Sequence, residues 1–264
     1  METALTDSHA HLSYVLDRQG QGAMDTIIKA YSVQGSEAFI LDIGVDYDDY
    51  PNRKALFGAF PFVKLSAGIW PDQDSLQSQK HIEERVSELE NWARDASCHA
   101  IGECGLDYHW MNGPKKAQEL LFRAQADLAL KLGKALIVHS RDAHPETFAV
   151  VKSYAASIPV IIHCFSYNEE ASLDYLSCGC YISFAGNLTY KNAAPLRAAC
   201  SKVPLNRLLL ETDSPYMNPE PLRGKPSSPL DIKRSYEIAA GLKACNSEKL
   251  VYIVKNNFKD ILNL

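Results

Sequence analysis

The sequence predicts an α/β protein, and within that class a single (β/α)8 barrel, or TIM barrel, that spans residues 1–264. Short apolar runs alternate with amphipathic stretches of helical length from one end of the chain to the other. The length of 264 residues matches the roughly 250 that such a barrel needs. The alternative, an open doubly wound sheet, usually carries a Gly-x-Gly-x-x-Gly or Gly-x-x-x-x-Gly-Lys loop, and neither occurs here.

Eight apolar segments have the composition of strands in a parallel sheet. Residues 135–138 (ALIV) and 159–162 (PVII) are continuously apolar, which is typical of strands that are covered on both faces. In chain order, the expected strands lie at residues 3–8, 38–44, 62–68, 99–103, 134–139, 158–163, 180–185 and 206–212.

Helical periodicity fills most of the gaps between these strands. It is clearest at residues 115–132, where apolar side chains recur at a spacing of three to four. The expected helices lie at about residues 23–34, 78–96, 115–132, 144–156, 168–178, 230–242 and 247–261. Residues 215–229 are rich in Pro, Gly and Ser and predict one long loop after the last strand, where a barrel places its active site.

The composition indicates a cytoplasmic protein. The net charge is −5 and there is no basic tail, so broad electrostatic capture of duplex nucleic acid is not expected. The seven cysteines are scattered without a Cys-x-x-Cys pair, which is typical of buried thiols in a reducing compartment. We find no signal-peptide pattern and no apolar run of about 18 residues, so we expect no membrane partner, and we expect a monomer.

Side chains that can bind metals fall at the C-terminal ends of five expected strands. They are His9, His11, Glu103, His139, His163 and Asp213. Each alone has an ordinary explanation, such as a surface histidine pair, a buried histidine or a loop cap. Together they occupy the end of a barrel that carries active sites, and unpartnered ionisable groups are costly to bury there. The remaining histidines at 81, 99, 109 and 144 are expected to have surface or structural roles.

Imidazole and carboxylate groups in this number predict a site for two divalent cations, with Mg²⁺, Mn²⁺ or Zn²⁺ as candidates. Residues two apart in an extended segment point to the same side, so His9 and His11 can face one ion. By the same rule Glu211 shares the facing of Asp213 and is expected to support a ligand. Two close cations need a bridging group, and they would lower the pKa of a shared water to supply hydroxide near neutral pH.

Five motifs, in this order along nearly the whole chain, resemble the TatD family of metal-dependent deoxyribonucleases, which belongs to the amidohydrolase-like metallohydrolases. They are DSHAH from Asp7, GECGLDY from Gly102, HSRDA from His139, HCFS from His163 and ETDSPY from Glu211. The resemblance implies that His9, His11 and Asp213 bind one metal. It implies that His139 and His163 bind the other, with Glu103 bridging the two.

The resemblance further implies hydrolysis of phosphodiester bonds, as a DNase with 3′-to-5′ exonuclease activity. We expect Asp213 to act as both metal ligand and proton acceptor, and Arg141 and Arg223 to hold phosphate oxygens at the mouth of the site. Two positions depart from the family pattern. Trp70 stands where the family usually has the histidine of a Gly-x-His-Pro turn, and Ser227-Ser228 stands where an asparagine is common.

Two enzyme classes and one binding class remain as alternatives. A metal-dependent amidase or lactonase, or a hydrolase of small phosphoesters, would use the same barrel and the same hydroxide. A nucleic-acid-binding protein without activity would keep the metal site for stability. Arginines at the mouth of the site favour a phosphate substrate, whereas an apolar pocket favours an acyl substrate.

Overall fold

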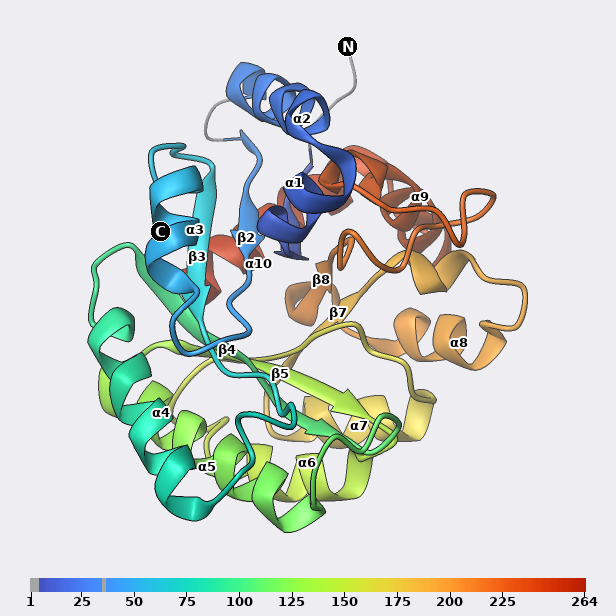
Figure 1. Cartoon of the computed structure of the whole chain (residues 1–264). Helices are drawn as coiled ribbons and strands as arrows, with labels where there is room; N and C mark the ends of the chain where they lie inside the picture. Colours follow the sequence, from blue (N-terminus) through green and yellow to red (C-terminus); the bar gives the residue numbers. More distant parts are fainter. Residues whose placement is uncertain (1–4, 35–36) are drawn as a thin grey trace.

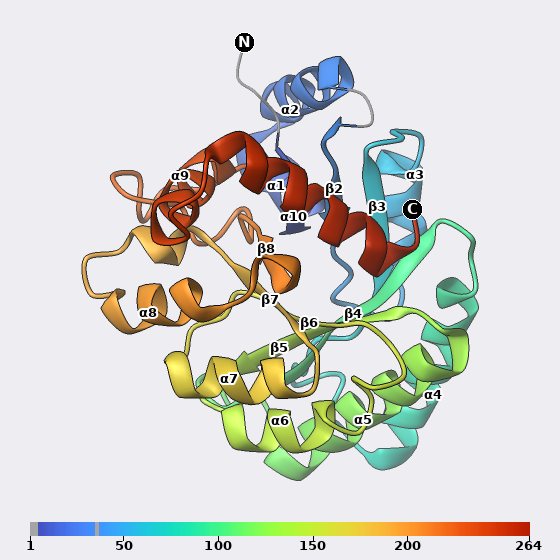
Figure 2. The same ribbon diagram turned by 180° about the vertical axis from the view of Figure 1, so that it is seen from behind.

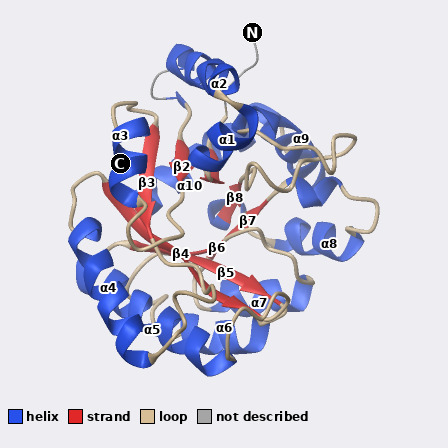
Figure 3. Cartoon of the chain, viewed as in Figure 1, coloured by secondary structure: helices blue, strands red, loops and turns tan. Residues whose placement is uncertain are grey.

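The structure, a computed structural model, describes residues 5–34 and 37–264. Within them, eight parallel strands pair in sequence order from β1 to β8 (Figures 1 and 3). The strands are β1 (Asp7–Ala10), β2 (Ile40–Asp42), β3 (Val63–Ala67), β4 (Cys98–Asp107), β5 (Ala135–Arg141), β6 (Val160–Ile162), β7 (Tyr181–Phe184) and β8 (Leu208–Leu210). Residues 3–4 of the first expected strand lie outside the described residues.

The barrel closes between β1 and the residues that follow β8. The backbone N–H of Asp213 donates to the carbonyl of His9 at 2.9 Å, and that of His11 donates to the carbonyl of Ser214 at 2.8 Å. Below them the Asp7 carboxylate accepts the backbone N–H and the hydroxyl of Thr212, at 3.0 and 2.6 Å. This seam and the strand order confirm the predicted (β/α)8 barrel.

Helices surround the strands on the outside (Figure 3). They are α1 (Leu12–Gln19), α2 (Gln21–Gln34), α3 (Tyr50–Phe57), α4 (Gln79–Ala93), α5 (Lys115–Leu132), α6 (His144–Val151), α7 (Glu169–Ser177), α8 (Ala194–Lys202), α9 (Lys233–Leu242) and α10 (Ser247–Leu262). Helices α1, α3 and α8 were not expected from the sequence, and they have only 8, 8 and 9 residues. The helix expected at 144–156 is shorter than predicted, because α6 ends at Val151 and turns follow.

Strand β4 is longer than expected, and its length matters for the site. It continues past Glu103 to Asp107, which pairs with Arg141 at the end of β5. Gly102 and Gly105 have positive φ angles of 132° and 145°. A Cβ atom at Gly105 would lie 2.0 Å from the carbonyl oxygen of His139. Only glycine therefore allows β4 to approach β5 this closely beside Glu103.

Helix α10 covers the end of the barrel where the strands begin (Figure 2). Its Phe258 ring stacks on Phe39, just before β2, with 5.7 Å between ring centroids. The Asn257 amide donates to the carbonyl of Leu208 at the start of β8, at 2.9 Å. The opposite end of the barrel is therefore the one left open to ligands. None of the described helices has the length and apolar content that a membrane crossing requires.

Candidate metal centre

The six predicted residues meet at the open end of the barrel. They reach it from five places in the fold, namely β1 with the residue that follows it, β4, β5, the residue after β6 and the segment after β8. Five of them line one cleft of about 1540 Å³, and His9 lies fully buried behind it. The prediction that residues far apart in sequence gather here agrees with the structure, because the C-terminal ends of parallel barrel strands converge.

Glu103 lies at the middle of this cluster, between two pairs of histidines. Its Oε2 atom is 3.1 Å from Nε2 of His9 and 3.6 Å from Nε2 of His11. Its Oε1 atom is 3.1 Å from Nδ1 of His139 and 3.3 Å from Nε2 of His163. Each carboxylate oxygen thus faces one pair of imidazoles. Asp213 joins the first pair, with Oδ1 3.6 Å from both Nε2 atoms.

The donor atoms have the chemistry of a cation site. The Nε2 atoms of His9 and His11 are 3.3 Å apart, and Nδ1 of His139 is 3.2 Å from Nε2 of His163. Among the described residues, Oε2 of Glu103 is buried without a well-oriented hydrogen-bond donor. The ligand atoms of His9, His11 and Glu103 lie within 4.8 Å of one another, as do those of Glu103, His139 and His163. Nitrogen and oxygen ligands in this arrangement fit divalent metals.

The electrostatics of the cluster favour a positive charge at its centre. Burial by itself raises the pKa of the Glu103 carboxyl, but the charge of His163 and hydrogen bonds from the histidines outweigh burial and hold that pKa well below its ordinary value. Burial lowers the pKa of His163, while the Glu103 and Glu211 carboxylates raise it well above its ordinary value. The carboxylates therefore favour a positive charge beside Glu103, and a bound cation can supply it.

Two further carboxylates orient the histidines of the second pair. Oδ2 of Asp107 lies 3.0 Å from Nε2 of His139, which sits opposite Gly105 and between the carboxylates of Asp107 and Glu103. Oε1 of Glu211 lies 3.4 Å from Nδ1 of His163 and accepts the backbone N–H of Cys164 at 2.7 Å. Carboxylates that hold the second ring nitrogen of a histidine are typical of metal sites.

Glu211 was expected to support a ligand, and it lies beside His163, whereas no role was expected for Asp107. A signal for Asp107 was available in the sequence. It lies four residues after Glu103, and alternate residues of a strand share a face. This signal was overlooked because the fourth strand was expected to end at residue 103.

Both predicted arginines line the cleft. The guanidinium carbon of Arg141 is 5.9 Å from the ring centre of Trp110, and that of Arg223 is 4.2 Å from the ring centre of Tyr190. Trp70, which stands where the family usually has a histidine, also lines the cleft. Its ring is edge-on to that of His139, with 6.0 Å between the ring centroids.

The remaining positions noted in the sequence have other surroundings. Ser227 is buried, and Ser228 caps the short 3-10 helix Pro229–Ile232. His109 and His144 lie on the cleft wall, where each faces an aspartate. His81 and His99 lie elsewhere, beside Arg85 and the carbonyl of Ser97. All seven cysteines are free thiols.

Comparisons with known proteins indicate the family of the whole chain. A family model described as TatD related DNase matches residues 6–263. A Bacillus subtilis (strain 168) protein, named as an uncharacterized metal-dependent hydrolase, YabD, is 31% identical over 265 residues, which cover 98% of this chain and 99% of that protein. The 3′-5′ ssDNA/RNA exonuclease TatD of Edwardsiella piscicida is 32% identical over 213 residues, which cover 78% of this chain and 80% of that protein.

A solved structure shares the fold. The TatD homologue YJJV of Escherichia coli K12 superposes with a TM-score of 0.86 and 23% sequence identity over 100% of both chains.

Proposed function

This chain belongs to the TatD-related DNase family as a metal-dependent hydrolase, and we propose that it cleaves phosphodiester bonds of single-stranded DNA or RNA with two divalent cations. The observation that carries the proposal is the position of Glu103, whose two carboxylate oxygens face two different histidine pairs. A carboxylate placed in this way can join two ions and keep them close together.

In this proposal His9, His11 and Asp213 would hold one cation, and His139 and His163 would hold the other. Glu103, which faces both sets, would contribute to both. When bound, the two cations supply positive charge that lowers the pKa of water and stabilises charge on the phosphate in the transition state. Asp107 and Glu211 keep the rings of His139 and His163 oriented through their second nitrogens.

The protein's own side chains then move the proton and hold the phosphate. Asp213 is 8% exposed and lines the cleft, so its carboxylate can reach an attacking water and accept its proton. Arg141 and Arg223 line the same cleft, and their N–H groups can donate to the non-bridging phosphate oxygens. Mg²⁺, Mn²⁺ and Zn²⁺ all suit this set of ligands.

Three considerations support a single-stranded nucleic acid over the alternatives. The Edwardsiella piscicida relative is named for 3′-5′ cleavage of ssDNA and RNA. Guanidinium groups in the cleft suit a phosphate better than the acyl group of an amide or lactone. The net charge of −5 gives no broad attraction for duplex DNA, so recognition must be local.

The test is hydrolysis of a single-stranded oligonucleotide labelled at its 3′ or its 5′ end. The protein is stripped with EDTA, and Mg²⁺, Mn²⁺ or Zn²⁺ is added back singly. We expect metal to restore shortening from the 3′ end, Glu103→Gln to abolish it, and Glu119→Gln to leave it unchanged. Glu119 is a fair control because it is half-exposed on α5 and, among the residues that the structure describes, forms its one ion pair with Arg123 of the same helix.

Each alternative has its own outcome. Shortening from the 5′ end would reverse the proposed direction. Failure to cleave with any metal, in protein that binds the ions, would exclude the nuclease and return attention to small phosphoesters and acyl substrates. Oligonucleotide binding without cleavage would identify a binding protein.

A further inference from the structure

The cleft carries three arginine–aromatic pairs, and we propose that they bind unpaired nucleobases and the phosphates beside them. The pairs are Arg18–Tyr216, Arg141–Trp110 and Arg223–Tyr190, and we call them the stacking rim. The inference rests on the proposed function and deepens it, because it names the side chains that select a substrate with exposed base faces.

All six members of the stacking rim line the cleft that contains the metal centre. The guanidinium carbon lies 4.7, 5.9 and 4.2 Å from the ring centre in the Arg18, Arg141 and Arg223 pairs, respectively. The pairs are built from separate parts of the chain, namely α1, the segments after β4, β7 and β8, and the end of β5. Such convergence around one cleft indicates a ligand surface more than local packing.

The arginines of the rim contact aromatic rings and, in the described part of the chain, no carboxylate. Among the described residues, none of its three arginines forms an ion pair, whereas Arg53, Arg94 and Arg123 each pair with a carboxylate. A guanidinium group stacked on a ring still has free N–H groups at its edge, and these match the oxygens of a phosphate. In a chain with a net charge of −5, three unpaired arginines around one cleft point to an anionic ligand.

Two aromatic rings of the rim are exposed, and hydrogen bonds hold the backbone at one of them. Trp110 is 63% exposed and Tyr216 is 38% exposed. Oδ1 of Asp107 accepts the backbone N–H groups of His109 and Trp110 at 3.0 and 2.8 Å. A large exposed ring on a cleft wall, carried by a backbone segment that is held in place, is typical of a ligand contact, because leaving such a ring in water does not stabilise the free protein.

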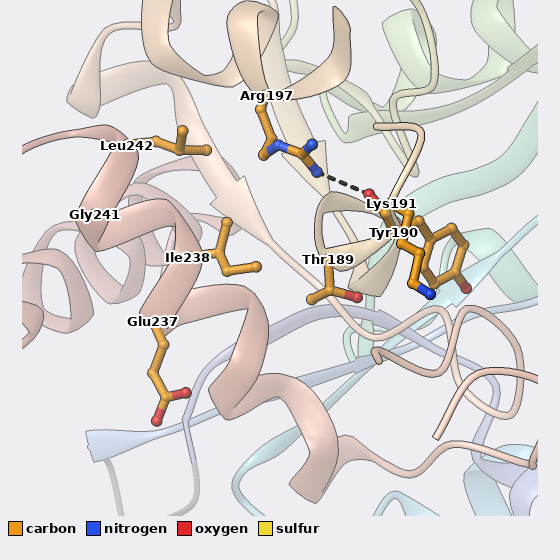
Figure 4. Close-up of a pocket in the computed structure, with 8 residues that line it drawn as sticks. All are labelled: Thr189, Tyr190, Lys191, Arg197, Glu237, Ile238, Gly241 and Leu242. Carbon is orange, nitrogen blue, oxygen red and sulfur yellow. Dashed lines mark hydrogen bonds between the residues drawn. The ribbon is translucent and has the colours of Figure 1, made fainter. Parts of the chain in front are cut away.

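Tyr190 is held from behind in a similar way. A second pocket of about 490 Å³ lies between α8, α9 and residues 189–191, and Figure 4 shows its lining. There the Arg197 guanidinium donates to the carbonyl of Tyr190 at 2.8 Å, and this hydrogen bond holds the backbone at Tyr190. The Tyr190 hydroxyl donates to the carbonyl of Asn218 at 3.2 Å. The ring therefore has a fixed position beneath Arg223.

The rim is connected to the metal ligands through one shared carboxylate and one ring contact. The carboxylate that fixes Trp110 also holds His139, since Oδ2 of Asp107 is 3.0 Å from Nε2 of that histidine. The ring of Tyr216 stands edge-on to His11, with 6.0 Å between centroids. Bases stacked on the rim would flank a phosphate at the metal centre. A duplex cannot make these contacts, because its base faces are already stacked.

The experiment compares kcat/KM for two single-stranded oligonucleotides, one normal and one whose three nucleotides at the cleaved end lack bases. We expect the wild type to prefer the normal strand, and Trp110→Ala to lower kcat/KM on that strand by about 5- to 150-fold, the range for about 1–3 kcal/mol per stacked base. The same variant should act on the abasic strand nearly as the wild type does. Trp110→Phe should retain most of the preference.

A matched control and a binding measurement separate the possible failures. Trp92→Ala removes another exposed indole, on α4 and outside the cleft, and should change neither rate. Fluorescence anisotropy with the Glu103→Gln protein measures oligonucleotide affinity without turnover, and adding Trp110→Ala should weaken it by a similar factor. Equal losses on both strands, or no preference in the wild type, would overturn the stacking rim. Absence of cleavage of either strand by the wild type would overturn the proposed function instead.

Discussion

The Asp107 carboxylate is the most informative single position to change. Its Oδ2 atom lies 3.0 Å from Nε2 of His139, while its Oδ1 atom accepts two backbone N–H groups at 3.0 and 2.8 Å. With the His139 proton on Nε2, the Nδ1 lone pair faces Glu103 and the metal centre. The substitution Asp107→Asn keeps the shape of the side chain and leaves it only one acceptor oxygen.

Either orientation of the new amide loses an interaction. If its NH2 group faces His139, the proton of that ring is driven to Nδ1, which then cannot bind a metal. If the NH2 group faces the backbone, two N–H groups of the Trp110 loop lose their acceptor. Removing a carboxylate behind a metal-binding histidine typically costs 10- to 100-fold in metal affinity, which corresponds to about 1.4–2.7 kcal/mol.

The assay is calorimetric titration of EDTA-stripped protein with Mn²⁺, together with hydrolysis measured against Mn²⁺ concentration. We expect a 10- to 100-fold weaker metal affinity and recovery of activity at high Mn²⁺. Asp174→Asn is the matched control, because Oδ2 of Asp174 also lies 3.0 Å from a histidine Nε2, that of His144, away from the six-residue cluster. If Asp107→Asn left the metal affinity unchanged, Asp107 would not support a ligand.

Three further predictions concern stability. Arg53 is buried, and its guanidinium lies 2.8 Å from the Asp42 carboxylate. Arg53→Ala should therefore lower the free energy of unfolding, measured in urea, by about 3–5 kcal/mol. A loss under about 1 kcal/mol would contradict this prediction. As a comparison, Lys80→Ala breaks an exposed ion pair with Glu84 and should change the free energy of unfolding by less than about 1 kcal/mol. Metal added at 100 times its Kd should stabilise the stripped protein by about 2.7 kcal/mol and raise its midpoint of thermal unfolding. An unchanged midpoint would mean that the ions do not bind the folded state in preference to the unfolded state. A hydrogen bond from Lys54 lowers the pKa of Asp95, so the stability from this pair should be present above the ordinary carboxyl pKa and be lost as the pH falls through the lowered value. Asp95→Asn should therefore be less stable than the wild type at neutral pH, with a difference that shrinks in acid, and a pH-independent difference would exclude this explanation.

The sequence by itself determined the barrel and the six-residue cluster. Apolar runs of strand length alternating with amphipathic stretches specify which faces are buried, and few folds bury eight such strands in this order. Once the barrel is accepted, the positions of His9, Glu103 and Asp213 at strand ends are enough to predict that they meet. This follows because parallel barrel strands all end on the same side.

The structure was needed for the short helices, because their stabilising contacts are not local. His11 precedes α1 but provides no side-chain cap for it. The first free N–H of the helix, that of Leu12, instead donates to Oδ1 of Asp42 at 2.9 Å. Asp42 is held in turn by Arg53 from α3. A local pattern of caps and apolar spacing cannot reveal a helix whose start is stabilised by a side chain from another strand.

Only the tertiary structure decided which side chains support the metal ligands and which line the cleft. The register of β4 against β5 places His139 opposite Gly105 and between Glu103 and Asp107. Closure of the barrel brings α1, with Arg18, beside Tyr216. Hydrophobic periodicity records burial within one segment, whereas these contacts depend on the register and closure of the whole barrel.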